Sequence, residues 1–373
     1  MAISPGARPA SGRRPVAATG PAAELVARGA GTSIHSGAVY SATTLSDGAP
    51  LPRVRSDDPE YQRLAHAEAE YWNRDLIGSL ESLEMVQGDS AVDRWTNERF
   101  TGDRNVPWQD TIAHYGVFRR GLILGTSAIG LEARILLTNP KLHLTFVDIS
   151  PGILARRREQ LGARFPGRVD VAVGDLNFVE LAPTAYDLIV SSASIHHVTN
   201  LEHLAWQINR ALTPDGYFFL QDYVGEPRFQ FSAEKKRLTA LLIDRETPPE
   251  WKRPMIWLDA SDLSPFCGVR SDDVLPTMRA HLAEERIRTA AALSVAMLRY
   301  TRQVDEPLPT PLRLKVWRTL DDRLRALRGK PPRARLYFRP GFVDELMRVG
   351  DLLSDTGLLA PGNAFAIYRK RAS

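Results

Sequence analysis

The sequence contains a single cysteine, Cys267, among its 373 residues. One cysteine cannot form an internal disulfide, and it cannot supply the paired cysteines of a CxxC metal knuckle. We therefore expect no metal site, and we expect Cys267 to be an inert core residue, as most lone cysteines are. A chain with so little cysteine is consistent with the reducing cytoplasm, which is the predicted location.

Long apolar runs and clustered charge of one sign are also missing. A membrane span needs about 18 uncharged apolar residues, and no run approaches that length, so we expect no membrane partner. The formal net charge is only +4, and without basic residues gathered on one face we expect no nucleic-acid partner. The tightest basic run, Arg156-Arg157-Arg158, falls inside a predicted helix and is interpreted as a solvated face.

The N-terminal third has little of the periodicity that a packed core requires. Residues 1–50 are rich in Ala, Gly, Pro, Ser and Arg, and their composition predicts a disordered tail. Residues 51–117 begin with a helical pattern that includes Tyr61 and Trp72, and they are predicted to form a helical lid region. Their aromatic side chains are expected either to cover a pocket or to pack against the main sheet.

A strand, a glycine turn, a helix and a second strand follow one another from residue 120 to residue 150. The first strand is Leu122–Leu124, the turn is bracketed by Gly125 and Gly130, and the second strand runs into Asp148. Backbone N–H groups at the start of such a helix can hold an anionic group, and a carboxylate at the next strand tip suits a ribose diol. The pattern therefore predicts a nucleoside pocket, although a βαβ crossover without a ligand remains open because Ser127 replaces the middle glycine of G-x-G-x-x-G.

The alternation of strands and helices continues through residues 118–373, which we assign to one domain. Further strands are predicted at residues 169–173, 186–190, 217–220, 285–293 and 364–369. The predicted fold is α/β, with a doubly wound, mostly parallel, seven-stranded Rossmann-like sheet and helical N-terminal and C-terminal additions that form a lid. Polar residues recur at the carboxyl ends of the parallel strands, where such sheets gather ligand groups: Asp148, Asp175, Ser191 and Asp222.

Residues 224–340 interrupt this alternation and are predicted to be a helical insertion. The basic, proline-punctuated part at residues 295–335 is expected either to lie over the pocket or to form an oligomer contact, which would give a homodimer. Four aromatic residues of the insertion are expected to be pocket walls or core: Phe229, Phe231, Trp251 and Trp257.

Six segments, taken in order, resemble the class I S-adenosylmethionine-dependent methyltransferases, in particular a bacterial subgroup that acts on small molecules. They are LILGTSAIGLEA at 122–133, FVDIS at 146–150, VGDLNFVEL at 173–181, YDLIVSSASIHHVTNLEHL at 186–204, ALTPDGYFFLQDYVGEPRFQF at 211–231 and FCGVRSDDVLP at 266–276. The order of the segments is more specific than any one of them. The resemblance implies S-adenosyl-L-methionine as the methyl donor.

The resemblance also implies which residues hold the donor. They are Gly125, Thr126, Ser127 and Gly130 around the methionine part, Asp148 and Ile149 at the ribose, Asp175 and Leu176 at the adenine, and Ser191 and Ser192 near the sulfonium. The turn departs from the family pattern at Thr126-Ser127-Ala128. Ser127 is therefore expected either to crowd the donor or to hydrogen-bond its carboxylate.

Two adjacent histidines, His196 and His197, follow the strand at 186–190 and are the candidate catalytic residues. An imidazole titrates near neutral pH, so one of them is expected to take the proton of an acceptor hydroxyl. The alternative is that both hold their loop by hydrogen bonds, while an acceptor such as a carboxylate needs no base. Because neighbouring side chains project differently, the pair alone is not expected to bind a metal.

Three residues near the end of the strand at 217–220 are candidates for binding the acceptor. Asp222 and Tyr223 follow that strand and are expected to orient the acceptor. Arg228 is expected either to pair with an anionic group of the acceptor or to pin the lid.

The predicted function is methylation of a small molecule, at oxygen, in natural-product or surface-glycan biosynthesis, and the pathway rests on resemblance alone. One alternative is a non-catalytic donor-binding or scaffold protein on the same fold. Another is a nicotinamide-dependent oxidoreductase or epimerase, which would share the first βαβ unit. That class should also show a Tyr-x-x-x-Lys pair, and we find none after the fourth or fifth predicted strand.

Overall fold

The computed structural model describes residues 55–74, 91–127, 129–246, 264–293 and 342–372, with residues 320, 323, 324, 327 and 328 between them. The predicted tail at residues 1–50, most of the basic region at 295–335, and Trp251 and Trp257 lie outside these residues. No helix of the described part is long and apolar enough to cross a membrane.

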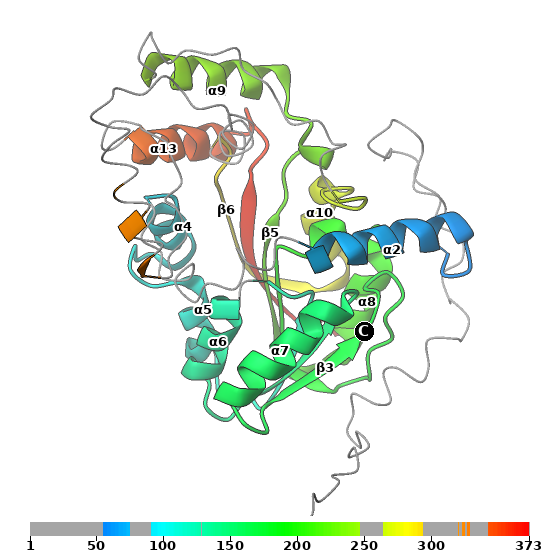
Figure 1. Ribbon diagram of the computed structural model, residues 1–373. Helices are drawn as coiled ribbons and strands as arrows, with labels where there is room; N and C mark the ends of the chain where they lie inside the picture. The colour runs from blue at the N-terminus through cyan, green and yellow to red at the C-terminus, as the bar shows by residue number, and fades with distance from the viewer. Residues whose placement is uncertain are drawn as a thin grey trace, which may run out of the picture.

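A seven-stranded sheet forms the centre of the molecule (Figure 1), as predicted. Its strands, in chain order, are β1 (Arg120–Leu124), β2 (His143–Asp148), β3 (Val169–Val173), β4 (Tyr186–Ser192), β5 (Leu212–Tyr223), β6 (Ala283–Ala290) and β7 (Asn363–Arg369). They lie side by side in the order β3-β2-β1-β4-β5-β7-β6. The first five pair in parallel, and β7 runs antiparallel to both β5 and β6. The predicted Rossmann-like architecture is confirmed.

The boundary between the helix before β5 and β5 itself differs from the sequence prediction. Helix α8 (Leu201–Ala211) ends at Ala211, and β5 begins directly at Leu212 rather than at the predicted Tyr217. Leu212 pairs with Tyr186 of β4, and a register shift before Leu188 absorbs the residues around Pro214. Pro214-Asp215-Gly216 therefore lie in an irregular stretch of β5 between the two parts that pair with β4.

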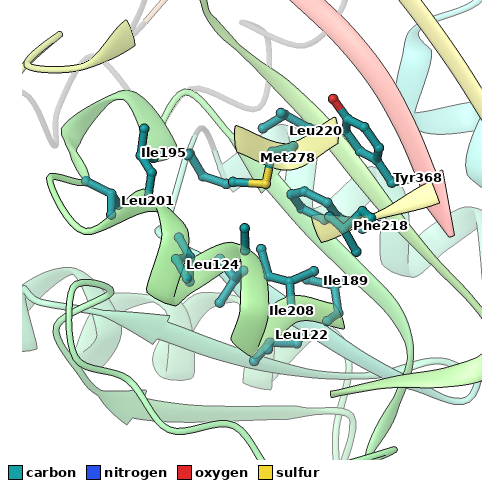
Figure 2. Close-up of a cluster of buried hydrophobic side chains, with 14 of the residues drawn as sticks. Leu122, Leu124, Ile189, Ile195, Leu201, Ile208, Phe218, Leu220, Met278 and Tyr368 are labelled. Carbon is teal, nitrogen blue, oxygen red and sulfur yellow. The ribbon is translucent and has the colours of Figure 1, made fainter. Parts of the chain in front are cut away.

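Residues of β1 alternate between the two faces of the sheet, as the side chains of a strand must. Leu122 and Leu124 are buried in one hydrophobic cluster with α8 and α10 (Val274–His281). Figure 2 shows this cluster, in which Ile208 of α8 and Met278 of α10 lie over the strands. Ile123 points to the opposite cluster. Both faces are covered, which explains the continuous apolar runs in the strand sequences.

The opposite face of the sheet is covered by helices from three parts of the chain. They are α4 (Ala91–Thr101), α5 (Trp108–Thr111), α6 (Ile129–Thr138), α7 (Pro151–Arg164) and α13 (Phe342–Asp355). Helix α7 begins at Pro151, because Ser150 Oγ accepts a hydrogen bond from the Ile153 N–H and so caps the helix. Asn200 is the N-cap residue of α8, but its side chain makes no capping bond and its Nδ2 donates to Asn177 O.

Helix α2 (Pro59–Arg74) lies beside α7 near the carboxyl ends of the parallel strands (Figure 1). Its buried residues Tyr61 and Leu64 pack against Phe266, which comes from the insertion. Helix α9 (Ala233–Glu246) and α13 lie at the β6–β7 end of the molecule. A covering role for these additions stays a prediction.

Candidate functional site

A cavity of about 270 Å³ lies at the carboxyl ends of the parallel strands. The strand order reverses between β1 and β4, and doubly wound sheets bind ligands at that point. The cavity is lined by Glu68, Trp72, Gly125, Thr126, Ser127, Leu131, Asp148, Ile149, Ile153, Asp175, Leu176, Asn177, Ser192, Ala193, Ser194, His197, Val198 and Phe266. Nine of these residues are among the predicted site residues, so residues from four strand ends do meet in one hollow.

The carboxylate of Asp148 is buried beneath the turn that follows β1. Its Oδ2 accepts hydrogen bonds from the Thr126 N–H at 2.8 Å and from Thr126 Oγ1 at 2.9 Å. Its Oδ1 accepts from the Ser150 N–H at 2.8 Å. Burial raises the pKa of Asp148, although these donors and the charge of Arg157 act in the opposite direction. The acid thus joins β2 to the turn and still lines the cavity.

Ser127 stands where the middle glycine of G-x-G-x-x-G would be, and a buried ion pair between Glu132 and Arg157 holds the turn at this residue. The Ser127 N–H donates to Glu132 Oε1 at 2.9 Å, and Arg157 Nη2 donates to Ser127 O. Arg157 Nε lies 2.5 Å from Glu132 Oε2, and the two side chains form an ion pair. Burial raises the pKa of Glu132 to about 7, against the lowering effect of Arg157. The solvated face predicted for the whole run 156–158 is therefore wrong at Arg157, which is 3% exposed.

Gly125 is the turn residue that requires glycine, and replacing it by alanine is expected to destabilise the protein. Its φ is +71°, and an added Cβ would overlap the side chain of Ser194 across the turn. The left-handed backbone alone costs about 1–3 kcal/mol for other residues, so the free energy of unfolding in urea should fall by at least that amount.

Gly162 offers a matched control for that measurement. It lies in α7, its added Cβ would meet nothing within 4 Å, and its φ is not in the left-handed region. Gly162→Ala should therefore stabilise the protein by about 0.5–1 kcal/mol. Equal effects of the two substitutions would contradict the role assigned to Gly125.

Asp175, after β3, is held from two sides. Its Oδ2 accepts a hydrogen bond from the Tyr61 hydroxyl of α2 at 2.7 Å, and its Oδ1 accepts from the Asn177 N–H at 2.9 Å. Burial raises the pKa of Asp175, and these donors limit the increase. Tyr61 therefore ties α2 to the predicted adenine end of the cavity.

His197 lines the cavity and is oriented by Glu68 of α2. Its Nδ1 lies 2.9 Å from Glu68 Oε1, and Glu68 also accepts hydrogen bonds from Trp72 Nε1 and from the Phe266 N–H. Burial raises the pKa of Glu68, but His197 and these donors outweigh it and hold the pKa at about 2. Burial lowers the pKa of His197, but the negative charges of Cys267 and Glu68 raise it well above its ordinary value.

His196 points away from the cavity into a buried cluster. Its Nδ1 lies 2.5 Å from Asp222 Oδ1, and its Nε2 lies 3.8 Å from Cys267 Sγ. Burial and His197 lower the pKa of His196, but Asp222 outweighs them and raises it. Burial raises the pKa of the Cys267 thiol, but the two histidines lower it to about 5. Cys267 is buried, as predicted for a core residue, but it is not isolated, because both histidines lie beside it.

Several predicted site residues do not line the cavity. Gly130 is buried within α6. Ser191 points to the other face of β4 from Ser192, and its Oγ donates to Leu124 O at 2.8 Å. Asp222 is fully buried and accepts from the Ile195 and Tyr223 N–H groups as well as facing His196. Its carboxylate therefore anchors the histidine loop.

Tyr223 and Arg228 lie in the aromatic cluster behind His196. The Tyr223 ring stacks on Phe229 with centroids 4.2 Å apart, and Arg228 Nη1 donates to Cys267 O at 3.3 Å. Arg228 is 3% exposed, and its Nε and Nη2 have no hydrogen-bond partner within the described ranges. Arg228 and Phe229 both have left-handed backbones, with φ of 56° and 55°.

Sequence reasoning missed Glu68 as a functional residue, although a signal was present. Tyr61 and Trp72 lie on the apolar face of the predicted helix, and Glu68 lies on that same face. A carboxylate on an apolar face is rarely left without a partner. The identity of the partner, His197, required the fold, because 129 residues separate the two.

The comparison with protein families gives a match to the model described as "Methyltransferase domain" over residues 124–218. Among curated proteins, a ubiquinone/menaquinone biosynthesis C-methyltransferase from Methylobacterium nodulans is 30% identical over 99 residues, which is 26% of this chain and 39% of that protein. A malonyl-[acyl-carrier protein] O-methyltransferase from Geobacter sulfurreducens is 33% identical over 94 residues, 25% of this chain and 34% of that protein. This chain thus spans well under half of the length of these relatives.

A solved structure of geranyl diphosphate C-methyltransferase from Streptomyces coelicolor A3(2) is 13% identical, with a TM-score of 0.44 over 85% of this chain and 100% of that one. It was determined with Mg²⁺, geranyl diphosphate and S-adenosyl-L-homocysteine. The family match and the sheet order together confirm the resemblance to class I methyltransferases that the sequence shows.

Proposed function

We propose that this chain, whose residues 124–218 carry a class I methyltransferase domain, moves a methyl group from S-adenosyl-L-methionine to a small-molecule acceptor. The acceptor atom we propose is a hydroxyl oxygen. The observation that carries the proposal is the cavity, in which the β1 turn, Asp148, Asp175 and His197 meet from four different strands.

The cavity wall fits the proposed donor. Ser127 lines the cavity, and its buried Oγ has no hydrogen-bond partner in the described part of the chain, which makes it the proposed donor to the methionine carboxylate. Asp148 lies at the tip of β2, where it would accept from the ribose hydroxyls, and Asp175 with Leu176 would hold the adenine. The donor supplies an electrophilic methyl group on its sulfonium.

A hydroxyl acceptor must lose its proton during the transfer, and His197 is placed to assist that loss. Because the pKa of the imidazole is raised well above its ordinary value, His197 can take the proton only at a pH above that raised pKa. It is the histidine of the pair that lines the cavity. Glu68 faces its Nδ1, which fixes the ring and leaves Nε2 to act on the acceptor. The remaining requirements of an in-line displacement are alignment and exclusion of water, and Trp72 and Phe266 contribute apolar walls for both.

Arg228 is the proposed contact for an anionic group of the acceptor. Because Arg228 lies behind His196 and does not line the cavity, this contact requires the aromatic cluster to open toward the cavity. The unpartnered Nε and Nη2 of Arg228 form the edge of the guanidinium that binds a carboxylate or phosphate in a bidentate manner. Tyr223 and Phe229 would pack against the body of the acceptor. We keep natural-product or surface-glycan biosynthesis, and a cytoplasmic location, as parts of the proposal.

Calorimetry with S-adenosylmethionine and with S-adenosylhomocysteine tests the proposal. Binding of both ligands, with turnover on a panel of hydroxylated small acids, is the expected result. Binding without turnover on any acceptor would favour the non-catalytic alternative. If neither nucleoside binds, the proposed function is wrong.

Asp148→Ala is expected to weaken the binding of S-adenosylhomocysteine by about 1–3 kcal/mol, because two ribose hydrogen bonds to a charged group would be lost. The affinity is measured by calorimetry, and a thermal scan checks that the variant folds. Asp148→Asn keeps the shape of the side chain and serves as the second variant if the alanine variant is unstable.

Asp215→Ala is the control, because the Asp215 side chain is 98% exposed and lies in the irregular stretch of β5. It should leave the affinity unchanged. If Asp148→Ala and Asp148→Asn also leave it unchanged in folded protein, Asp148 does not hold the ribose.

A further inference from the structure

Three metal-binding side chains converge between the cavity and the aromatic cluster behind it. His196, His197 and Cys267 each offer one ligand atom, and these atoms all lie within 4.8 Å of one another. The two histidines lie in a short 3-10 helix after β4, and Cys267 comes from the insertion 71 residues after His196. The fold therefore supplies the third ligand that the adjacent histidines lack in the sequence.

Both imidazoles are held in the orientation that metal-bound histidines adopt. His196 Nδ1 faces Asp222 Oδ1 at 2.5 Å, and His197 Nδ1 faces Glu68 Oε1 at 2.9 Å. A metal-binding histidine almost always donates its second ring N–H to a carboxylate, carbonyl or water, which fixes the ring and its tautomer. Each Nε2 is then left with a lone pair, and His196 Nε2 already lies 3.8 Å from Cys267 Sγ.

The charges around the three ligands also favour a dication. A thiol binds metals as the thiolate, and Asp222 and Glu68 add two further negative charges in contact with the histidines. Arg228 is the positive group against the cluster, since its Nη1 donates to Cys267 O. Three negative charges and one positive charge leave two negative charges, and a divalent ion would neutralise them.

We propose that His196, His197 and Cys267 bind one Zn²⁺ ion, with a fourth position open toward the cavity. Two imidazoles and a thiolate suit zinc, whereas magnesium and calcium prefer oxygen ligands. Bonds of about 2.0–2.1 Å to nitrogen and about 2.3 Å to sulfur put tetrahedral ligands about 3.4–3.6 Å apart. The His196–Cys267 separation of 3.8 Å is already close to this value, and the widest separation must shorten by rotation of buried side chains.

The ion would have a role in the proposed methyl transfer. His197 lines the cavity, so an acceptor hydroxyl there can take the open position. A zinc-bound hydroxyl loses its proton far more readily than a free one, as zinc-bound water does. The proton leaves to solvent or a nearby acceptor, and the oxygen is left as the nucleophile. This role rests on the proposed function, whereas the metal site itself rests on the ligands alone.

The test uses full-length protein without an affinity tag, because a polyhistidine tag binds the same metals. Elemental analysis after purification in zinc-containing buffer should find one zinc per chain. After removal of zinc by a chelator, titration with Co²⁺ should give a thiolate-to-cobalt charge-transfer band that saturates at one equivalent. Cys267→Ser should abolish the band, and His196→Ala or His197→Ala should weaken Co²⁺ binding at least tenfold.

Two further variants separate a built site from adventitious binding. Asp222→Asn removes the charge behind His196 and should weaken the metal by about 10–100-fold, as loss of such a partner typically does. His114→Ala removes an exposed histidine before β1 and should change nothing. The proposal is overturned if folded protein holds no zinc and gives no charge-transfer band, or if Cys267→Ser leaves metal binding intact. Binding of S-adenosylhomocysteine, measured in the same samples, reports separately on the proposed function.

Discussion

Replacing His197 by alanine is expected to lower kcat by about 10²- to 10⁴-fold, the range that positioned proton transfer contributes. Binding of S-adenosylhomocysteine should change much less, because the ribose and adenine contacts come from other strands. His197 lines the cavity, and its Nδ1 faces Glu68 Oε1, so deleting it removes an oriented group beside the acceptor. The measurement is turnover of labelled S-adenosylmethionine with the best acceptor of the panel, together with calorimetry.

Glu68→Gln and His66→Ala give this prediction its controls. Glu68→Gln keeps the size of the side chain but removes the charge that orients His197, so kcat should fall less than with His197→Ala. His66 is exposed on the same helix, two residues away, and its loss should leave kcat unchanged. If His197→Ala leaves kcat intact, or lowers donor affinity by the same factor as kcat, His197 does not assist the chemistry.

Cys267→Ser distinguishes the two ways in which His197 can act. If the imidazole takes the proton itself, the serine variant should keep most of the turnover, because Cys267 does not line the cavity. If the imidazole holds zinc, the variant should lose both metal and turnover. Either result is compatible with methyl transfer, so the comparison concerns only the mechanism.

The central part of the fold followed from local sequence features. Buried parallel strands have continuous apolar runs that a single sequence displays, and glycine turns with polar strand tips indicate the ligand edge. These signals were sufficient to place Asp148, Asp175 and Ser192 around one hollow. It is harder to predict which face of the sheet a side chain at a strand end points to. Ser191 and Ser192 are adjacent in the chain, and only Ser192 lines the cavity.

The contacts that complete the site join residues far apart in the chain, and a single sequence carries no record of them. Glu68 meets His197 across 129 residues, and Cys267 meets His196 across 71. Asp222 was predicted as an acceptor contact because it lies at the end of a strand. It is instead fully buried, and its carboxylate holds the loop that carries His196. The expectation of no metal rested on the single cysteine and on the adjacent histidines taken separately, and the packing of the insertion brings these three ligand atoms together.

Arg157→Met is expected to lower the free energy of unfolding by about 3–5 kcal/mol, the usual effect of leaving one partner of a buried ion pair alone. Glu132 is fully buried, and without Arg157 its charge would have no opposite charge in contact. The same change should weaken donor binding, because Arg157 holds the Ser127 carbonyl in the turn. Urea unfolding measures the first effect, and calorimetry with S-adenosylhomocysteine measures the second.

The matched controls come from the same helix and the same pair. Arg158→Met removes an exposed neighbour and should change stability by no more than about 0.5 kcal/mol. The double variant Glu132→Gln, Arg157→Met removes both charges and should recover much of the stability lost in the single variant. If Arg157→Met and Arg158→Met destabilise equally, the ion pair does not support the turn.

The stability lost in Arg157→Met should also depend on pH, in a direction set by Glu132. Burial raises the pKa of Glu132 from 4.5 to about 7 in the folded protein, so between these values the folded state binds the proton more tightly than the unfolded state. The stability from this group is complete below pH 4.5 and is lost as pH rises toward 7. Removing Arg157 raises the folded pKa further, so the difference between variant and parent should be larger at pH 8 than at pH 5. A difference that stays constant across this range would mean that the Glu132 charge is not what the arginine compensates.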